Sequence, residues 1–221
     1  MCGRYGFVPG KNFDERFQVE HHQETLLPSY NVAPGATMPV VLRNSPNRVE
    51  LMKWGLIPFW AKDPKNSYKT INARAETVAT SPVFREALKR RRCLVPASGF
   101  YEWQQTERGK LPYFIHLKDI ELFAFAGLYD VWQDAEGNEL RTYTIITTTP
   151  NDLVQPIHNR MPVILHPDDE AMWIDPKMND TAALRALLQP FPNALMEAYP
   201  VSRAVNTAAI DTPALIEPVA A

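Results

Sequence analysis

The feature that most constrains the fold is a series of strand-like segments that fills the middle of the chain. Each segment is rich in β-branched and aromatic residues and is bounded by turn-forming residues. Seven such segments cover residues 38–44, 48–55, 92–98, 100–105, 111–117, 122–132 and 141–149. Between the last two, the Glu-Gly-Asn sequence predicts a hairpin turn.

Helical signals are fewer and lie mainly outside this region. Ser81 and Pro82 suit the N-cap and first position of a helix over 81–92, whose last turn is basic. Two more short helices are predicted at 166–174 and 181–189. Because strands and helices do not alternate, a parallel α/β sheet is disfavoured. We expect an α+β fold, a single domain over residues 1–221, with a curled, barrel-like and largely antiparallel sheet flanked by short helices.

Composition limits the compartment, cofactors and partners. No segment approaches the roughly 20 apolar residues of a membrane helix, and the start lacks a secretory signal. The only two cysteines are Cys2 and Cys93, and no histidine pair has metal-ligand spacing. We therefore expect a reducing, cytoplasmic setting with no metal and no cofactor. Because the net charge is −2, any nucleic acid would have to meet a local basic surface.

Cys2 is unusual because removal of Met1 would make it the first residue of the chain. Its α-amine and thiol would then lie on adjacent carbons and form a 1,2-aminothiol, which no internal residue can supply. A cysteine within the chain is more often a small apolar filler.

Glu102 lies in the strand-like sequence GFYEWQ, where alternation places it on the same face as Phe100. Tyr101 and Trp103 occupy the other face. A carboxylate among bulky rings is partly desolvated, which raises its pKa and suits it to proton transfer near neutral pH. The same pattern also fits a surface glutamate on an edge strand.

A second polar pattern lies in TINARAETVATSP, residues 70–82. As a strand, this segment would line one face with Asn72, Arg74 and Glu76. Asn and Arg together can bind a phosphate or a polarised oxygen. The alternative is a polar face in water, on which Arg74 and Glu76 pair with each other.

Two loops and one basic run complete the candidates. His158 and Arg160 lie in a proline-bracketed loop, a usual place for functional residues, although a lone histidine is more often structural or solvated. Trp60 lies near lysines in GLIPFWAKDP, which is typical of base stacking on single-stranded nucleic acid, unless the tryptophan belongs to the core. The basic run in ALKRRRC, residues 87–93, is predicted to be a solvated helix end.

Nine segments together resemble the SOS response-associated peptidase (SRAP) family, which includes proteins that process abasic sites. The resemblance runs from residue 2 to about residue 218, and its motifs are specific only in combination. In chain order they are MCGRYG, YNVAPG, KWGLIPFWA, INARAET, CLVPASGFYEW, FAFAGLYDVW, TYTIITTTPN, IHNRMPVIL and YPVSRAVN.

The resemblance implies a covalent reaction with single-stranded DNA that carries an abasic site. After Met1 is removed, the amine of Cys2 would condense with the sugar aldehyde, and the thiol would close a thiazolidine ring. This cross-link would shield the lesion during the DNA damage response. The resemblance assigns Glu102 to proton transfer, His158 to stabilising the intermediates and Asn72 to positioning Cys2. It assigns DNA contacts or lining of the site to Arg4, Asn31, Pro34, Trp60, Arg74, Trp103, Thr147 and Arg160.

One departure and several open questions accompany the resemblance. Some members carry a second aromatic residue directly after the position of Trp60, where this chain has Ala61, so stacking is expected to be weaker or shared with another side chain. The family name implies removal of the residue ahead of Cys2, but an aminopeptidase would remove a lone Met, so general proteolysis is not expected. Strand cleavage and self-processing stay open, as do the roles of Ser202, Arg203 and Asn206.

Two rival functions are also compatible with some of these residues. Class II glutamine amidotransferases also begin with a nucleophilic cysteine, but the other motifs do not resemble theirs. A plain single-strand-binding module would depend on Arg74 and Trp60 and not on Cys2. We expect a monomer that binds abasic single-stranded DNA and no membrane.

Overall fold

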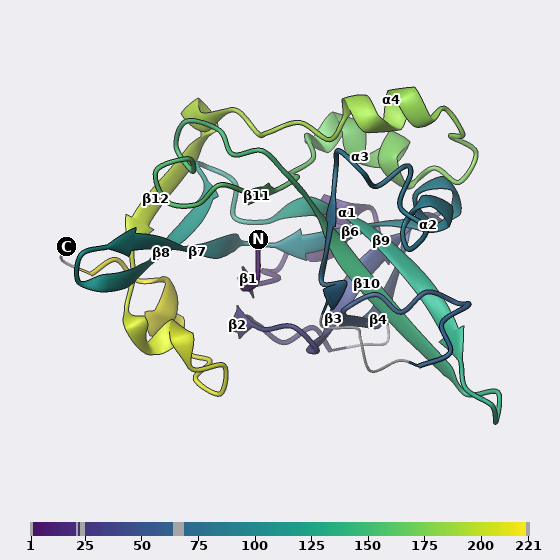
Figure 1. Ribbon diagram of the computed structural model, residues 1–221, viewed down its shortest axis with the longest axis horizontal. Coiled ribbons are helices and arrows are strands. Elements are labelled where there is room, and N and C mark those ends of the chain that lie inside the picture. The colour runs from purple at the N-terminus through teal and green to yellow at the C-terminus, as the bar shows by residue number, and fades with distance from the viewer. Residues whose placement is uncertain (1, 21, 23–24, 64–68, 220–221) are drawn as a thin grey trace.

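A closed β-barrel forms the larger part of the molecule, shown on the right of Figure 1. The computed structural model describes residues 2–20, 22, 25–63 and 69–219. The barrel closes because β10 pairs with both β4 and β9. Its strands, in order around the ring, are β10 (Glu139–Thr148), β4 (Arg48–Trp54), β3 (Thr37–Leu42), β6 (Arg92–Ala97) and β9 (Phe123–Gln133).

A second sheet of five strands lies beside the barrel, with its β7–β8 hairpin extending to the left in Figure 1. In order, its strands are β12 (Met196–Pro200), β8 (Gly109–Leu117), β7 (Gly99–Thr106), β1 (Tyr5–Phe7) and β2 (Ser29–Val32). Two short strands, β5 (Asn72–Arg74) and β11 (Met161–Pro162), pair with the carboxyl end of β10. Among the described strands, β10 pairs in parallel with β4 and β5, and the other pairs are antiparallel.

The helices are short. They are α1 (Phe13–Phe17), α2 (Arg85–Arg90), α3 (Pro167–Ile174) and α4 (Thr181–Ala186), with 3-10 turns η2 (Asn193–Leu195), η3 (Arg203–Asn206) and η4 (Pro213–Ile216). Of these, α2 and α3 pack on barrel strands, whereas the 3-10 turns η3 and η4 contact the second sheet. No helix in the described part of the chain is long and apolar enough to cross a membrane.

Tyr5 joins the two sheets. It comes from β1, yet its ring contacts Trp54 and Phe125 of the barrel at centroid distances of 5.3 and 5.9 Å. Its hydroxyl shares a hydrogen bond of 2.8 Å with the hydroxyl of Tyr143. Because the two sheets share this core, the structure confirms a single α+β unit with a barrel-like, mostly antiparallel sheet.

The helix predicted at 81–92 is wrong at both ends. The helix α2 begins at Arg85 after the N-cap Phe84, because the backbone N–H groups of Phe84 and Arg85 both bond to the carbonyl of Ser81 and form a turn first. At the other end, Arg92 is not solvated. It is buried and donates hydrogen bonds to five backbone carbonyls, those of Leu88, Lys89, Trp173, Asp175 and Met178.

The strand predicted at 70–82 is also too long, because β5 ends at Arg74. The N–H groups of Thr77 and Val78 bond to the carbonyl of Arg74, which turns the chain away from the sheet. Asn72 and Arg74 do share a face of the strand, as predicted, but Glu76 lies in the turn.

Candidate active site

Cys2 is held beside Glu102 by the pairing of β1 with β7. The antiparallel register joins Tyr5 to Phe100, and the N–H of Tyr101 bonds to the carbonyl of Arg4 at 3.0 Å. Continued toward the start of the chain, this register brings residues 2–4 alongside 101–103. The Cys2 side chain is fully buried, and its Sγ lies 3.8 Å from the carbonyl oxygen of Arg4.

Burial controls the protonation of both groups. Glu102 is only 2% exposed, and desolvation raises the pKa of its carboxyl to about 8. Burial, followed by the charge of Glu102, raises the pKa of the Cys2 thiol well above its usual range. At pH 7 the carboxyl is therefore mostly protonated and the thiol is neutral. Because β7 lies between β8 and β1, Glu102 is not a surface residue on an edge strand.

His158 completes a compact group with Glu102. Its Nδ1 lies 3.7 Å from Oε2 of Glu102, and the N–H of Arg160 donates to the same Nδ1 at 3.1 Å. Desolvation lowers the pKa of the imidazole, so the ring is mostly neutral at pH 7. The carbonyl of Arg160 lies 3.2 Å from the same Nδ1, so the two backbone contacts suit different tautomers of the neutral ring.

Arg160 and Thr147 lie at the carboxyl end of β10, where β5 and β11 flank it. Thr147 pairs with Arg74 on one side and with Pro162 on the other. Nη2 of Arg160 donates to the Thr147 carbonyl at 2.6 Å. Asn72 is buried on β5, and its Oδ1 has no hydrogen-bond partner among the described residues.

Arg4 and Asn31 are used within the protein. Nη1 of Arg4 donates to Asn31 Oδ1 at 2.7 Å and to the carbonyl of Val205 at 3.0 Å. The Asn31 amide in turn donates to the carbonyls of Thr207 and Ile210. The pair therefore fastens the residues at β1 and β2 to the C-terminal segment. Their DNA contacts stay predictions.

The open roles of the VSRAVN segment are partly structural. The Ser202 hydroxyl caps η3 by accepting from the N–H of Ala204. Asn206 Oδ1 accepts from Nε1 of Trp103 at 2.8 Å, which fixes the half-buried indole. Arg203 is exposed, and its guanidinium lies 3.4 Å from the carbonyl of Arg108.

Trp60 is exposed and not part of the core, and the structure adds an aromatic neighbour that the sequence patterns did not single out. Trp60 is 52% exposed and Phe59 is 54% exposed. The turn that presents them is fixed, because Asp130 Oδ2 accepts from the N–H of Phe59 at 3.1 Å. The guanidinium of Arg91 lies 5.4 Å from the centre of the Phe59 ring. Pro34, the other predicted wedge, is exposed on its loop.

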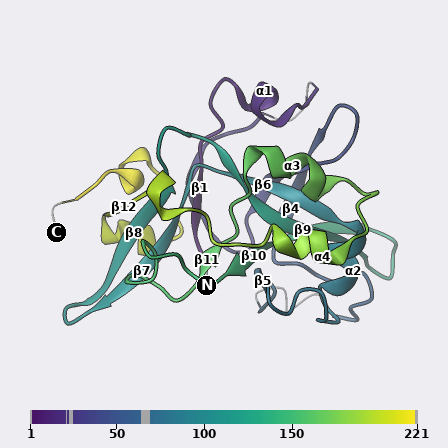
Figure 2. The same ribbon diagram turned by 90° about the horizontal axis from the view of Figure 1, so that it is seen from above.

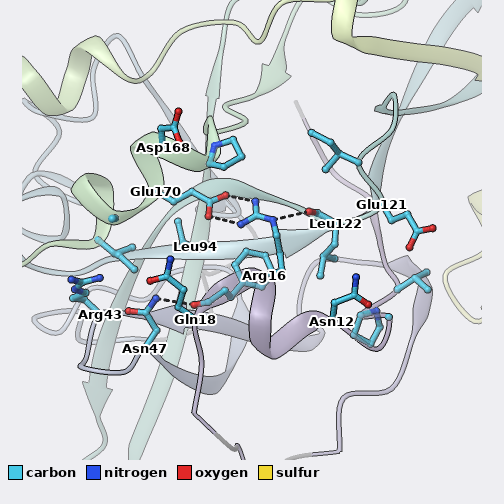
Figure 3. Close-up of a pocket in the computed structure, with 18 of the residues that line it drawn as sticks. Asn12, Arg16, Gln18, Arg43, Asn47, Leu94, Glu121, Leu122, Asp168 and Glu170 are labelled. Atoms are coloured by element: carbon cyan, nitrogen blue, oxygen red, sulfur yellow. Dashed lines mark hydrogen bonds and ion pairs between the residues drawn. The ribbon is translucent and has the colours of Figure 1, made fainter.

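A large cavity lies elsewhere, and none of the predicted site residues lines it. It has a volume of about 760 Å³, and Arg16 and Glu170 form a bidentate ion pair on its wall (Figure 3). It lies beside α1, on the opposite side of the molecule from β5 and β11 (Figure 2). Among the described residues there is no cluster of three or more potential metal ligands. The group formed by Cys2, Glu102 and His158 therefore lies outside this cavity.

This chain is similar to known proteins over most of its length. The profile described as "SOS response associated peptidase (SRAP)" matches residues 1–208. The abasic site processing protein YoqW of Bacillus subtilis is 47% identical, over 98% of this chain and 99% of that protein. The abasic site processing protein HMCES of Gallus gallus is 38% identical, over 87% of this chain and 66% of that protein.

The fold is also similar to those of solved structures. A crystal structure of a protein from Bacteroides thetaiotaomicron superposes with a TM-score of 0.87 at 30% identity, covering 99% of this chain and all of that one. A phage-related protein from Bordetella bronchiseptica has a TM-score of 0.71 at 28% identity, covering 91% of this chain and 95% of that one. On this evidence the chain belongs to the SOS response associated peptidase (SRAP) family.

Proposed function

We propose that this protein processes abasic sites by forming a covalent thiazolidine cross-link between Cys2 and the lesion in single-stranded DNA. The observation that carries the proposal is the placement of Cys2 against a buried carboxyl with a pKa of about 8. The names of the relatives YoqW and HMCES point to the same substrate. The proposal requires removal of Met1, because only a free α-amine condenses with an aldehyde.

The reaction proceeds without an oxidant or reductant. The Cys2 amine attacks the aldehyde carbon of the ring-opened deoxyribose, and loss of one water leaves a C=N bond. The sulfur then bonds to the same carbon, and the proton from the thiol ends on the nitrogen. Because the thiol is held beside the imine carbon, ring closure benefits from a high effective concentration.

Glu102 supplies the proton transfers. Its carboxyl, mostly protonated at pH 7, donates the proton that the departing water needs. The resulting carboxylate then accepts the proton of the neutral Cys2 thiol. His158, in its neutral form, forms a hydrogen bond with a sugar hydroxyl. Asn72 offers its unpartnered Oδ1 to a donor on Cys2 or the new ring.

The DNA strand follows two arginines and the exposed rings. Arg74 and Arg160 contact phosphates, while Pro34, Phe59 and Trp60 contact bases beside the lesion. Phe59 thereby supplies the second ring that is missing at Ala61. Thr147 and Trp103 line the site, and Arg4 and Asn31 hold its base. We also propose that the protein acts as a monomer, since one chain supplies the whole group.

Cross-linking to an abasic oligonucleotide, followed by denaturing electrophoresis, tests the proposal. Cys2→Ala is the informative control because it keeps the α-amine and loses the thiol. The wild type should give a shifted band without treatment, whereas Cys2→Ala should give one only after borohydride reduces the imine. Intact mass establishes whether Met1 has been removed. Equal bands from the two proteins without reduction would contradict ring formation by the thiol.

The rival functions predict different results. A single-strand-binding module would bind the oligonucleotide reversibly and show no covalent band in either protein. A glutaminase would release ammonia from glutamine, and that activity would depend on Cys2. Strand cleavage beside the lesion would appear as shortened DNA. We expect more of it from Cys2→Ala, because its imine is not trapped as a ring.

A further inference from the structure

Glu76 forms an ion pair with Arg160, one of the cations assigned to DNA. Its Oε1 and Oε2 accept from Nη1 and Nη2 of Arg160 at 2.6 and 3.0 Å, which is a bidentate pairing. Hydrogen bonding to Arg160 is the main cause that lowers the pKa of Glu76, and the charge of Arg74 adds to it. The carboxylate is therefore ionised at neutral pH and pairs with the Arg160 guanidinium.

The carboxylate covers the solvent side of Arg160. The Glu76 side chain is 47% exposed and the Arg160 side chain is 13% exposed. The remaining contacts of the guanidinium come from Thr147, whose carbonyl and hydroxyl accept from Nη2 at 2.6 and 3.3 Å. Arg160 is thus held in place by β10 as well as by Glu76. Its outward edge is the edge that a phosphate would approach.

We propose that Glu76 occupies the phosphate position on Arg160 and so determines how strongly the protein discriminates against undamaged single-stranded DNA. This inference rests on the proposed function. Bidentate pairing with arginine has the same geometry for a carboxylate as for a phosphate, so the two anions compete for one edge. An undamaged strand must displace Glu76 and gains only reversible contacts. An abasic strand becomes committed by the bond to Cys2.

Equilibrium binding of undamaged single-stranded DNA, measured by fluorescence anisotropy at several salt concentrations, tests this role. Glu76→Gln should bind about two- to fivefold more tightly than the wild type, the range expected for loss of an exposed ion pair. The slope of log K against log[salt] should become steeper by up to about 0.7, because Arg160 of the variant no longer exchanges a carboxylate for the phosphate and its charge becomes fully available to the DNA. Glu136→Gln, at the exposed β9–β10 tip, makes the same change in net charge and should match the wild type.

A double-mutant comparison tests whether Glu76 acts through Arg160. In an Arg160→Gln background, Glu76→Gln should give little further gain, and equal thermal melting of the variants would show that folding is intact. Binding by Glu76→Gln that is equal to or weaker than the wild type would overturn the inference and make Glu76 a mere support for Arg160. Tighter binding by Glu76→Gln with no covalent capture of abasic DNA would support the competition and contradict the cross-linking function.

Discussion

Replacing Glu102 by Gln should stabilise the fold in a pH-dependent way, because the buried carboxyl resists ionisation. The pKa of Glu102 is raised from its ordinary 4.5 to about 8, so the folded state binds a proton that the unfolded state releases. Stability from this group is complete below pH 4.5 and is lost as the pH rises toward 8. Glutamine keeps the shape and has no proton to lose.

The magnitude follows from the separation of the two pKa values. At about 1.36 kcal/mol for each pH unit, ionisation of Glu102 costs the wild type about 3 kcal/mol at pH 7 and about 4 to 5 kcal/mol at pH 8 and above. Because His158 is present in both proteins, its lowered pKa contributes nearly the same free energy to each and cancels in the difference between their stabilities. The free energy of unfolding of Glu102→Gln, relative to that of the wild type, should therefore increase by several kcal/mol between pH 5 and pH 8.

Urea unfolding of both proteins at pH 5, 6, 7 and 8 measures this difference directly. The gap in free energy of unfolding should widen steadily with pH, while the variant should lose covalent capture. Equal m-values would show that the two proteins expose the same surface on unfolding. A gap that stays constant with pH would refute the reasoning, because it would mean that Glu102 ionises normally in the folded protein.

Three further predictions concern DNA contacts and the core. Phe59→Ala should weaken binding of undamaged single-stranded DNA by about 1 kcal/mol or more in an anisotropy titration, and unchanged affinity would remove Phe59 from the DNA path. Tyr5→Phe should cost about 1 to 3 kcal/mol in chemical unfolding, because the buried Tyr143 hydroxyl loses its partner. Arg92→Met should cost about 3 kcal/mol or more, since it removes a donor from five carbonyls, and a neutral result would contradict a stabilising role for these hydrogen bonds.

Much of the fold followed from local pattern. Alternation and turn residues placed the strands well, because a two-residue period is a property of neighbouring residues. The errors occurred where distant partners decide the outcome. Arg92 looked like part of a solvated basic run, yet carbonyls from α3 and the loop beyond it, some 80 residues away in sequence, draw it into the core. Likewise, Ser81 has the residue type of an N-cap, but its carbonyl accepts the hydrogen bonds of a turn that precedes the helix.

The candidate site shows the same limit. The ring-flanked pattern around Glu102 left a desolvated carboxyl and a surface glutamate both open, and the structure shows that the residue is buried, which raises the pKa of its carboxyl. The ion pair of Glu76 with Arg160, 84 residues apart, had no local signal, and the sequence favoured Arg74 as the partner. The exposure of Phe59 also depends on how its turn packs, which no periodicity reveals. Assignment of the roles of Cys2 and the DNA-contacting residues came from family resemblance.

The most direct test of the central claim is mass spectrometry of the Cys2 peptide after reaction with abasic DNA. The cross-linked protein would be digested with nuclease and protease, denatured and treated with iodoacetamide. We predict a peptide that begins at Cys2, carries the sugar remnant less one water, and is not alkylated, while Cys93 in the same sample is alkylated. A sugar remnant on a lysine, or a Cys2 thiol that still reacts with iodoacetamide, would contradict the thiazolidine.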